Sequence, residues 1–181
     1  MKKERLESVA EHIYGVQMLA IAMCLEYGYE IDLMKVIMML AVHELEEVAM
    51  GDIIPFEMSL EEKKARGQAV VAEMLSELQD GKKVRELFTE YYEQRTPEAK
   101  FAKWCDKLEA DLQMKIYDDE GRVDLVEQDG NAMLADVEVQ EVAKGKQSAA
   151  EIWLEYNRQK NGYDENFLAV SRYVEEHKIS A

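Results

Sequence analysis

Two of the three histidines in this 181-residue sequence stand in apolar segments that also carry acidic residues. His43 is followed directly by Glu44, and Glu47 comes four residues after His43, so the two share one face of a continuous helix. His12 falls on the apolar stripe of an earlier helix, and Asp106 interrupts a third apolar segment. Because imidazoles and carboxylates are costly to bury without partners, these residues are the candidates for chemistry.

A divalent cation would supply the positive charge that several buried carboxylates and imidazoles need. Two histidines and two carboxylates suit Mn²⁺, Fe²⁺, Co²⁺, Ni²⁺ or Zn²⁺. Two alternatives stay open. Each histidine by itself is also typical of a hydrogen-bonded core residue, and Glu44, Glu46 and Glu47 could form a solvated helix end that is reached as the helix leaves the core.

The elements that must position these residues are helices. Ser8 and Glu11 have the spacing of a capping box, and apolar residues with a period of 3.6 follow as far as Gly28, which places His12 one turn inside a first helix. A second helix is predicted from about Asp32 to Met50, apolar on every side at its centre and therefore buried all round. Capping signals and periodicity predict further helices over about residues 59–78, 83–94, 96–117, 147–159 and 164–177.

Residues 118–141 hold nine acids and one arginine, and we interpret them as a solvated loop and helix face. The sequence shows no strand alternation, no repeat and no linker. We therefore expect one all-α domain of seven or eight helices over residues 1–181.

A net charge of −16 argues against a polymeric nucleic acid as ligand, because the surface repels its phosphates, although a small phosphorylated substrate remains compatible. No apolar run reaches the length of a membrane span, and no signal peptide is seen. Cys24 and Cys105 lie in apolar helical surroundings and are interpreted as two buried thiols. We expect a cytoplasmic protein that does not bind membranes.

Four blocks together resemble the HD-domain superfamily of metal-dependent phosphohydrolases, in its 5′-deoxynucleotidase-like branch. They are ESVAEH at residues 7–12, HELEE at 43–47, GDI at 51–53, and TPEAKF through CDKLE at 96–109. The resemblance covers about residues 5–117, and residues 118–181 match nothing that we recognise.

The resemblance implies a site and a reaction. His12, His43, Glu44 and Asp106 would bind one divalent metal ion, with Mg²⁺ added to the candidates above. Glu47 would orient or deprotonate the attacking water, and Asp52 would hydrogen-bond the substrate or protonate its leaving oxygen. Arg5 and Lys107 would hold phosphate. The implied activity is a phosphomonoesterase acting on nucleoside monophosphates or a similar small phosphate, and since related proteins are often dimeric we expect a homodimer.

The sequence departs from the family pattern at Glu44, where the family normally has aspartate. The branch also carries an earlier helix with an Arg-Trp pair, which this sequence lacks, so we do not carry over deoxynucleotide specificity. A degenerate HD-domain binding or scaffold protein is therefore the alternative. A third hypothesis is an interaction protein without a site, in which four aromatic residues of the last third contact a partner: Trp153, Tyr156, Phe167 and Tyr173. We favour the interpretation that these residues complete the core of this domain.

Overall fold

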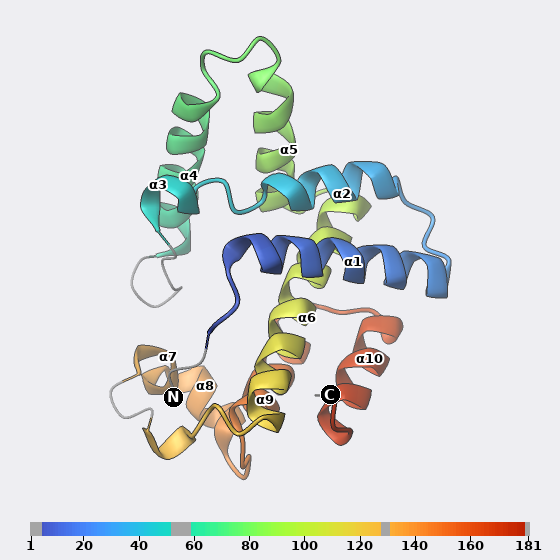
Figure 1. Ribbon diagram of the computed structural model, residues 1–181, viewed down its shortest axis with the longest axis vertical. Helices are drawn as coiled ribbons and strands as arrows, with labels where there is room; N and C mark the ends of the chain where they lie inside the picture. Colours follow the sequence, from blue (N-terminus) through green and yellow to red (C-terminus); the bar gives the residue numbers. More distant parts are fainter. Residues whose placement is uncertain (1–4, 52–58, 128–130, 180–181) are drawn as a thin grey trace. The chain divides into compact units, whose positions relative to one another are not determined.

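The structure is a computed structural model that describes residues 5–51, 59–127 and 131–179, and every regular element among them is a helix (Figure 1). The all-α prediction is confirmed. The helices are α1 (Val9–Tyr27), α2 (Leu33–Val42), α3 (Glu47–Met50), α4 (Leu60–Met74), α5 (Gly81–Glu93), α6 (Pro97–Asp119), the 3₁₀ helix η1 (Leu125–Glu127), α7 (Ala132–Ala135), α8 (Val137–Ala143), α9 (Ala149–Lys160) and α10 (Glu165–Glu176).

The chain forms two compact units, and each has its own packing. Unit 2 is Ser8–Cys105, and unit 1 combines Met1–Glu7 with Asp106–Ala181. The division falls inside α6, which continues as an unbroken helix from Cys105 to Asp106. No described helix is both long enough and apolar enough to cross a bilayer.

In unit 2, α1 begins as its sequence predicts. The Ser8 side chain accepts a hydrogen bond from the Glu11 backbone while the Glu11 carboxylate accepts one from the Ser8 backbone, which is a complete capping box. The helix ends at Gly28, whose φ of 66° is the left-handed conformation that glycine adopts without strain. α1 packs against α2, and α2 and α4 both pack against α5 (Figure 1).

The predicted helix from Asp32 to Met50 is wrong in two respects. It is broken, because α2 ends at Val42, residues 43–46 form a turn, and α3 begins at Glu47. The turn is tight: the amide of Leu45 bonds the carbonyl of Val42 at 3.2 Å, a three-residue spacing typical of 3₁₀ geometry. It is also not buried all round, since Met34 and Met38 face outward. This break and the short helices α7 and α8 raise the count in the described residues above the expected seven or eight.

Unit 1 has a smaller apolar core between α9 and α10. Ala150, Leu154 and Val174 are buried there, and Leu112 and Met114 of α6 pack against them. Of the four C-terminal aromatic residues, Phe167 is buried, Trp153 and Tyr156 are half-buried, and Tyr173 is exposed. The hypothesis that they complete the core is therefore correct for Phe167 and wrong for Tyr173.

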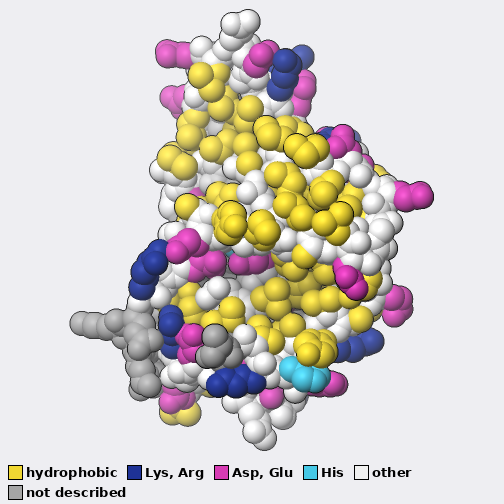
Figure 2. Space-filling view, turned by 45° about the vertical axis from the view of Figure 1, so that its right-hand side comes forward, with side chains coloured by type: hydrophobic (Ala, Val, Ile, Leu, Met, Phe, Trp, Pro, Cys, Tyr) yellow, Lys and Arg dark blue, Asp and Glu magenta, His cyan; other side chains and the backbone are white. Residues whose placement is uncertain are grey.

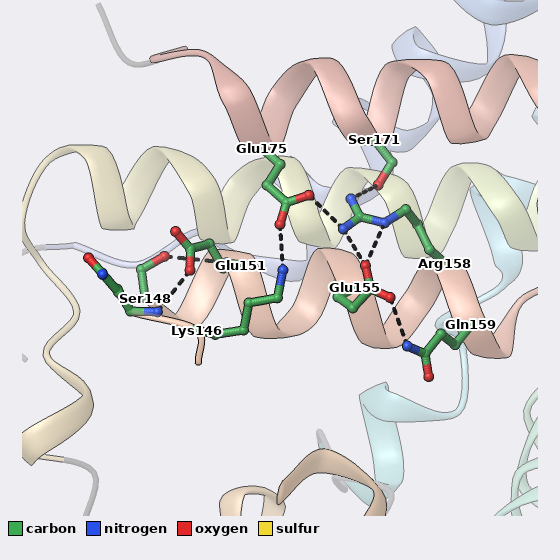
Figure 3. A network of polar contacts seen from close by, with 9 residues as sticks. Lys146, Ser148, Glu151, Glu155, Arg158, Gln159, Ser171 and Glu175 are labelled. Atoms are coloured by element: carbon green, nitrogen blue, oxygen red, sulfur yellow. Dashed lines mark hydrogen bonds and ion pairs between the residues drawn. The ribbon is translucent and has the colours of Figure 1, made fainter. Parts of the chain in front are cut away.

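Arg158 on α9 takes part in a network of polar contacts in unit 1 (Figure 3). Its guanidinium donates hydrogen bonds to the carboxylates of Glu155 and Glu175, each at 2.6 Å, and to the Ser171 hydroxyl at 3.2 Å. Lys146 adds an ion pair to Glu175 at 2.8 Å. The network joins α9 to α10 and to the segment that precedes α9.

Two smaller predictions can be compared directly. The solvated loop and helix face predicted for residues 118–141 includes the end of α6, η1, α7 and part of α8, and Val139 within it is buried. Cys105 is buried and Cys24 is half-buried, and neither forms a disulfide, in agreement with the interpretation as thiols.

Candidate metal centre

His43 is the residue that caps α2, and its side chain is completely buried. Its Nδ1 lies 2.7 Å from the carbonyl oxygen of Leu40. A carbonyl oxygen can only accept, so Nδ1 carries a hydrogen and donates it. This is the arrangement by which proteins commonly orient a metal-binding histidine, because the other ring nitrogen is then fixed in direction.

The Nε2 atom of His43 lies 3.1 Å from Oε1 of Glu44. A neutral imidazole with its hydrogen on Nδ1 has a lone pair on Nε2, and that lone pair would face a carboxylate oxygen that also only accepts. The arrangement is favourable only with a positive charge between or on these atoms, supplied by a proton or by a metal ion. The chemistry of the donor atoms therefore fits a cation.

Four side chains can converge on such an ion. His12 is half-buried, and its ring centroid is 5.5 Å from that of His43. Each of His12, His43, Glu44 and Asp106 offers one ligand atom, and these atoms all lie within 4.8 Å of one another. Asp106 is the first residue past the division between the units, but it directly follows Cys105 in the continuous α6 helix. Mixed nitrogen and oxygen ligands of this kind suit a first-row divalent metal.

The other predicted site residues have different surroundings. Lys107 pairs with Asp106, its Nζ lying 3.3 Å from Oδ2. Arg5 is exposed in unit 1, and its backbone oxygen accepts a hydrogen bond from Arg122. Asp52 lies outside the described residues. The phosphate-binding and catalytic roles of these residues stay predictions.

The prediction that Glu47 and His43 share one face of a continuous helix is wrong, because α2 ends at Val42 and α3 begins at Glu47. The amide of Glu47 instead bonds the carbonyl of Glu44 at 3.1 Å, a three-residue spacing. Such a spacing is typical of a tight 3₁₀ turn, so Glu47 begins α3 one tight turn after Glu44. The half-buried Glu47 is outside the group of four ligand atoms.

Glu46 is a functional candidate whose environment the sequence did not reveal. It is only 1% exposed, so the interpretation of residues 44–47 as a solvated helix end is wrong at this position. Oε1 accepts a hydrogen bond from the Tyr92 hydroxyl, whereas Oε2 has no hydrogen-bond partner. Burial raises the pKa of the Glu46 carboxyl, and the Tyr92 hydrogen bond partly opposes that rise.

Tyr91 is a second functional candidate that the sequence pattern did not indicate. Its buried ring meets the His43 ring edge-on, with the centroids 5.2 Å apart. Lys103 of α6 donates a hydrogen bond to the Tyr91 hydroxyl at 3.0 Å, and its Nζ lies 4.8 Å from the ring centroid. The adjacent pair Tyr91 and Tyr92 was the available signal in the sequence, since one of two neighbouring helical residues usually faces outward.

This chain is similar in sequence to one protein family and to individual curated proteins. The model of a family described as HD domain matches residues 1–147. A 5′-deoxynucleotidase HDDC2 from Dictyostelium discoideum is 37% identical over 122 residues, which cover 62% of this chain and 63% of that protein. The 5′-deoxynucleotidase hdd1 of Schizosaccharomyces pombe is 34% identical over 122 residues, which cover 64% of this chain and 60% of that protein. The chain thus spans less than two thirds of the length of these curated relatives.

A solved structure shares the fold more completely. The PH0347 protein from Pyrococcus horikoshii OT3 is 26% identical, with a TM-score of 0.58 over 89% of this chain and 86% of that one. Both the family match and this structural match extend past residue 117, where the resemblance in the sequence blocks ended.

Proposed function

This chain belongs to the HD-domain family, and on that basis we propose that it is a metal-dependent phosphohydrolase. Its substrate would be a nucleoside monophosphate or a similar small phosphate. The observation that carries the proposal is the grouping of ligand atoms from His12, His43, Glu44 and Asp106 within 4.8 Å. The relatives named 5′-deoxynucleotidases support the substrate class, and the net charge of −16 favours a small phosphate over a polymeric one.

Each residue of the site would have its own role in the reaction. A divalent cation held by the four ligands would neutralise charge on a phosphoryl oxygen and make water acidic enough to react at neutral pH. Glu47, three residues after Glu44 in the chain, would orient that water and accept its proton. Asp52 would hydrogen-bond the substrate or protonate its leaving oxygen, and Lys107 and Arg5 would contact the phosphate.

The test is phosphate release from a panel of nucleoside monophosphates with added Mn²⁺ or Co²⁺. His43→Ala should abolish release, whereas His177→Ala is the matched control because His177 is exposed at the end of α10 and stacks on Tyr173. Absence of turnover over the whole panel would count against the enzyme. If the protein also purified without metal and bound none, the degenerate binding protein would be the better description.

We also propose that the chain forms a homodimer through the outer face of α1 and α2. Tyr14, Met18 and Leu25 are exposed along one stripe of α1, and Met34 and Met38 along one stripe of α2. Figure 2 shows hydrophobic side chains gathered where these helices lie. Exposed apolar patches are typical of contact sites.

A second copy of this chain suits that face better than a charged partner does. α1 carries only Glu11 and Glu26, and α2 only Lys35, in a protein whose net charge is −16. In a symmetric contact through these weakly charged helices, few like charges of the two acidic copies come close together, so repulsion is smallest there. Sedimentation equilibrium should give twice the chain mass, and Leu25→Glu with Met34→Glu should return it to the monomer mass. A monomeric wild type at micromolar concentration would exclude this interface.

A further inference from the structure

Two consecutive tyrosines of α5 contact the two ends of the turn formed by residues 43–46. The Tyr91 ring packs edge-on against His43, at the start of the turn. The Tyr92 hydroxyl donates a hydrogen bond to Glu46, at its end. Glu44 lies between these two fixed points, so the backbone that carries this ligand is held from both sides.

A turn of this kind needs external support. Its backbone bonds span three residues, as in Leu45 to Val42 and Glu47 to Glu44, and such bonds have poorer geometry than those of an α-helix. A metal ligand must nevertheless be held within a fraction of an ångström of its productive position. The support must therefore come from side chains outside the turn.

The contacts made by Tyr92 and Glu46 leave them little freedom. The Tyr92 ring packs against Phe88, with centroids 4.9 Å apart, and stands at 90° to the Tyr91 ring. On the other side, α4 approaches Glu46 at Gly67, where an added Cβ would lie 3.3 Å from both Cβ and Cγ of Glu46. Glu46 is thus enclosed between α4 and α5.

Tyr91 is held in turn by α6. Lys103 bonds its hydroxyl and covers its ring, and Lys103 lies one helical turn before the ligand Asp106. The same helix therefore carries a metal ligand and fixes the aromatic ring that contacts another ligand.

We propose that Tyr91 and Tyr92 are positioning residues that lock the 43–46 turn and thereby set the affinity of the site for its metal ion. This inference rests on the proposed metal-dependent function. Neither tyrosine touches substrate in this proposal, and both act through the placement of His43 and Glu44.

Calorimetric titration of the intact apo protein with MnCl₂ tests the lock directly. Tyr92→Phe removes only the hydroxyl and should weaken Mn²⁺ binding by about tenfold, the lower end of the range for residues that orient metal ligands. Glu46→Gln keeps an acceptor for the Tyr92 hydroxyl and should stay within about threefold of wild type. Tyr27→Phe, at the exposed end of α1, is the matched control and should bind like wild type.

Amide hydrogen exchange without metal gives a second readout. Tyr92→Phe should speed exchange at the amides of Leu45 and Glu47, and it should leave the middle of α1 unchanged. Should Tyr92→Phe fold poorly, Tyr91→Phe, which removes only the hydroxyl that meets Lys103, should show the same two effects to a smaller degree.

The outcomes distinguish the positioning role of Tyr91 and Tyr92 from the proposed phosphohydrolase activity. Unchanged Mn²⁺ affinity in Tyr92→Phe would reject the positioning role of the tyrosines, whether or not the wild type releases phosphate. A wild type that binds Mn²⁺ but hydrolyses nothing would count against the proposed function and leave the affinity comparison standing. If the wild type bound no Mn²⁺ at all, the proposed function would fail, and unaltered exchange at Leu45 and Glu47 would then reject the lock as well.

Discussion

The side-chain nitrogen of Asn157 donates a hydrogen bond to Oδ1 of Asp111 at 2.7 Å, between α9 and α6 in unit 1. Asp111 is only 2% exposed, and its Oδ2 has no hydrogen-bond partner. Burial raises the pKa of Asp111 to about 8, despite the opposing effects of Asn157, Lys107 and Arg158. Asp111 is thus a buried carboxylic acid that keeps its proton at neutral pH.

We expect Asp111→Asn to stabilise the protein at pH 7.5 by about 2 kcal/mol or more. The raised pKa means that the folded state holds a proton that the unfolded state has released. The contribution of Asp111 to stability is complete below pH 4 and is lost as the pH rises towards 8. Urea denaturation from pH 4 to 8.5 should show the difference between variant and wild type growing with pH. A constant difference would contradict this account.

Metal binding should stabilise the fold. At a free Mn²⁺ concentration 100 times the Kd, the gain is about 2.7 kcal/mol, which raises Tm by about 5–10 °C in a chain of this size. Thermal scans with Mn²⁺ and with a chelator measure it. The shift should vanish in His43→Ala and persist in His177→Ala, and a shift that survives in His43→Ala would place the metal elsewhere.

Glu44→Ala should weaken Mn²⁺ affinity at least about tenfold, because it removes a ligand and not merely one of its outer partners. Glu44→Asp restores the residue that the family normally carries and should bind Mn²⁺ at least as tightly as wild type. Calorimetric titration compares the three proteins. Equal affinity in Glu44→Ala would show that this carboxylate is not a ligand.

Arg158→Met should destabilise the protein by about 1.5–3 kcal/mol, because it removes the charged hydrogen bonds to Glu155 and Glu175, although Lys146 still pairs with Glu175. Lys144→Met removes an exposed pair with Glu141 and should change stability far less. Urea denaturation followed by circular dichroism measures both variants. If the two variants lost equal stability, the network around Arg158 would have no special structural importance.

Ser8→Ala should cost about 1 kcal/mol, since it removes the acceptor at the start of α1. His12 lies one turn further along this helix, so fraying of the first turn should also weaken Mn²⁺ binding. Thermal scans and the calorimetric titration described above test the two effects. Unchanged stability would mean that tertiary contacts, not the cap, fix the start of α1.

The parts of the fold that depend on neighbouring residues in the sequence were predicted well. Ser8, Gly28 and Thr96 act on the backbone within four residues, and the helix boundaries that they predict agree closely with the structure. The break after Val42 was missed, and the turn that follows it is contacted by residues of distant helices. Tyr92 and Gly67 are far from the break in the chain, and no local sequence pattern predicts their contacts with Glu46.

The candidate ligands were found because a histidine beside an acid is unusual in an apolar segment. Asp111 was missed although a signal existed: it lies three residues after Leu108, on the stripe that buries α6. An acidic residue is usually exposed, and the contact with Asn157 of α9 shows that this one is enclosed. The helical spacing of Asp111 was therefore a better guide to its burial than its residue type.

The turn at residues 43–46 has a consequence for how homologous sequences should vary. Glu44 and Glu46 are two residues apart, yet one joins the ligand atoms and the other is enclosed against Tyr92. Positions 46 and 92 should therefore change together across relatives, with an acid at 46 where residue 92 bears a hydroxyl. Position 44 should instead follow the metal that each relative uses, independently of both.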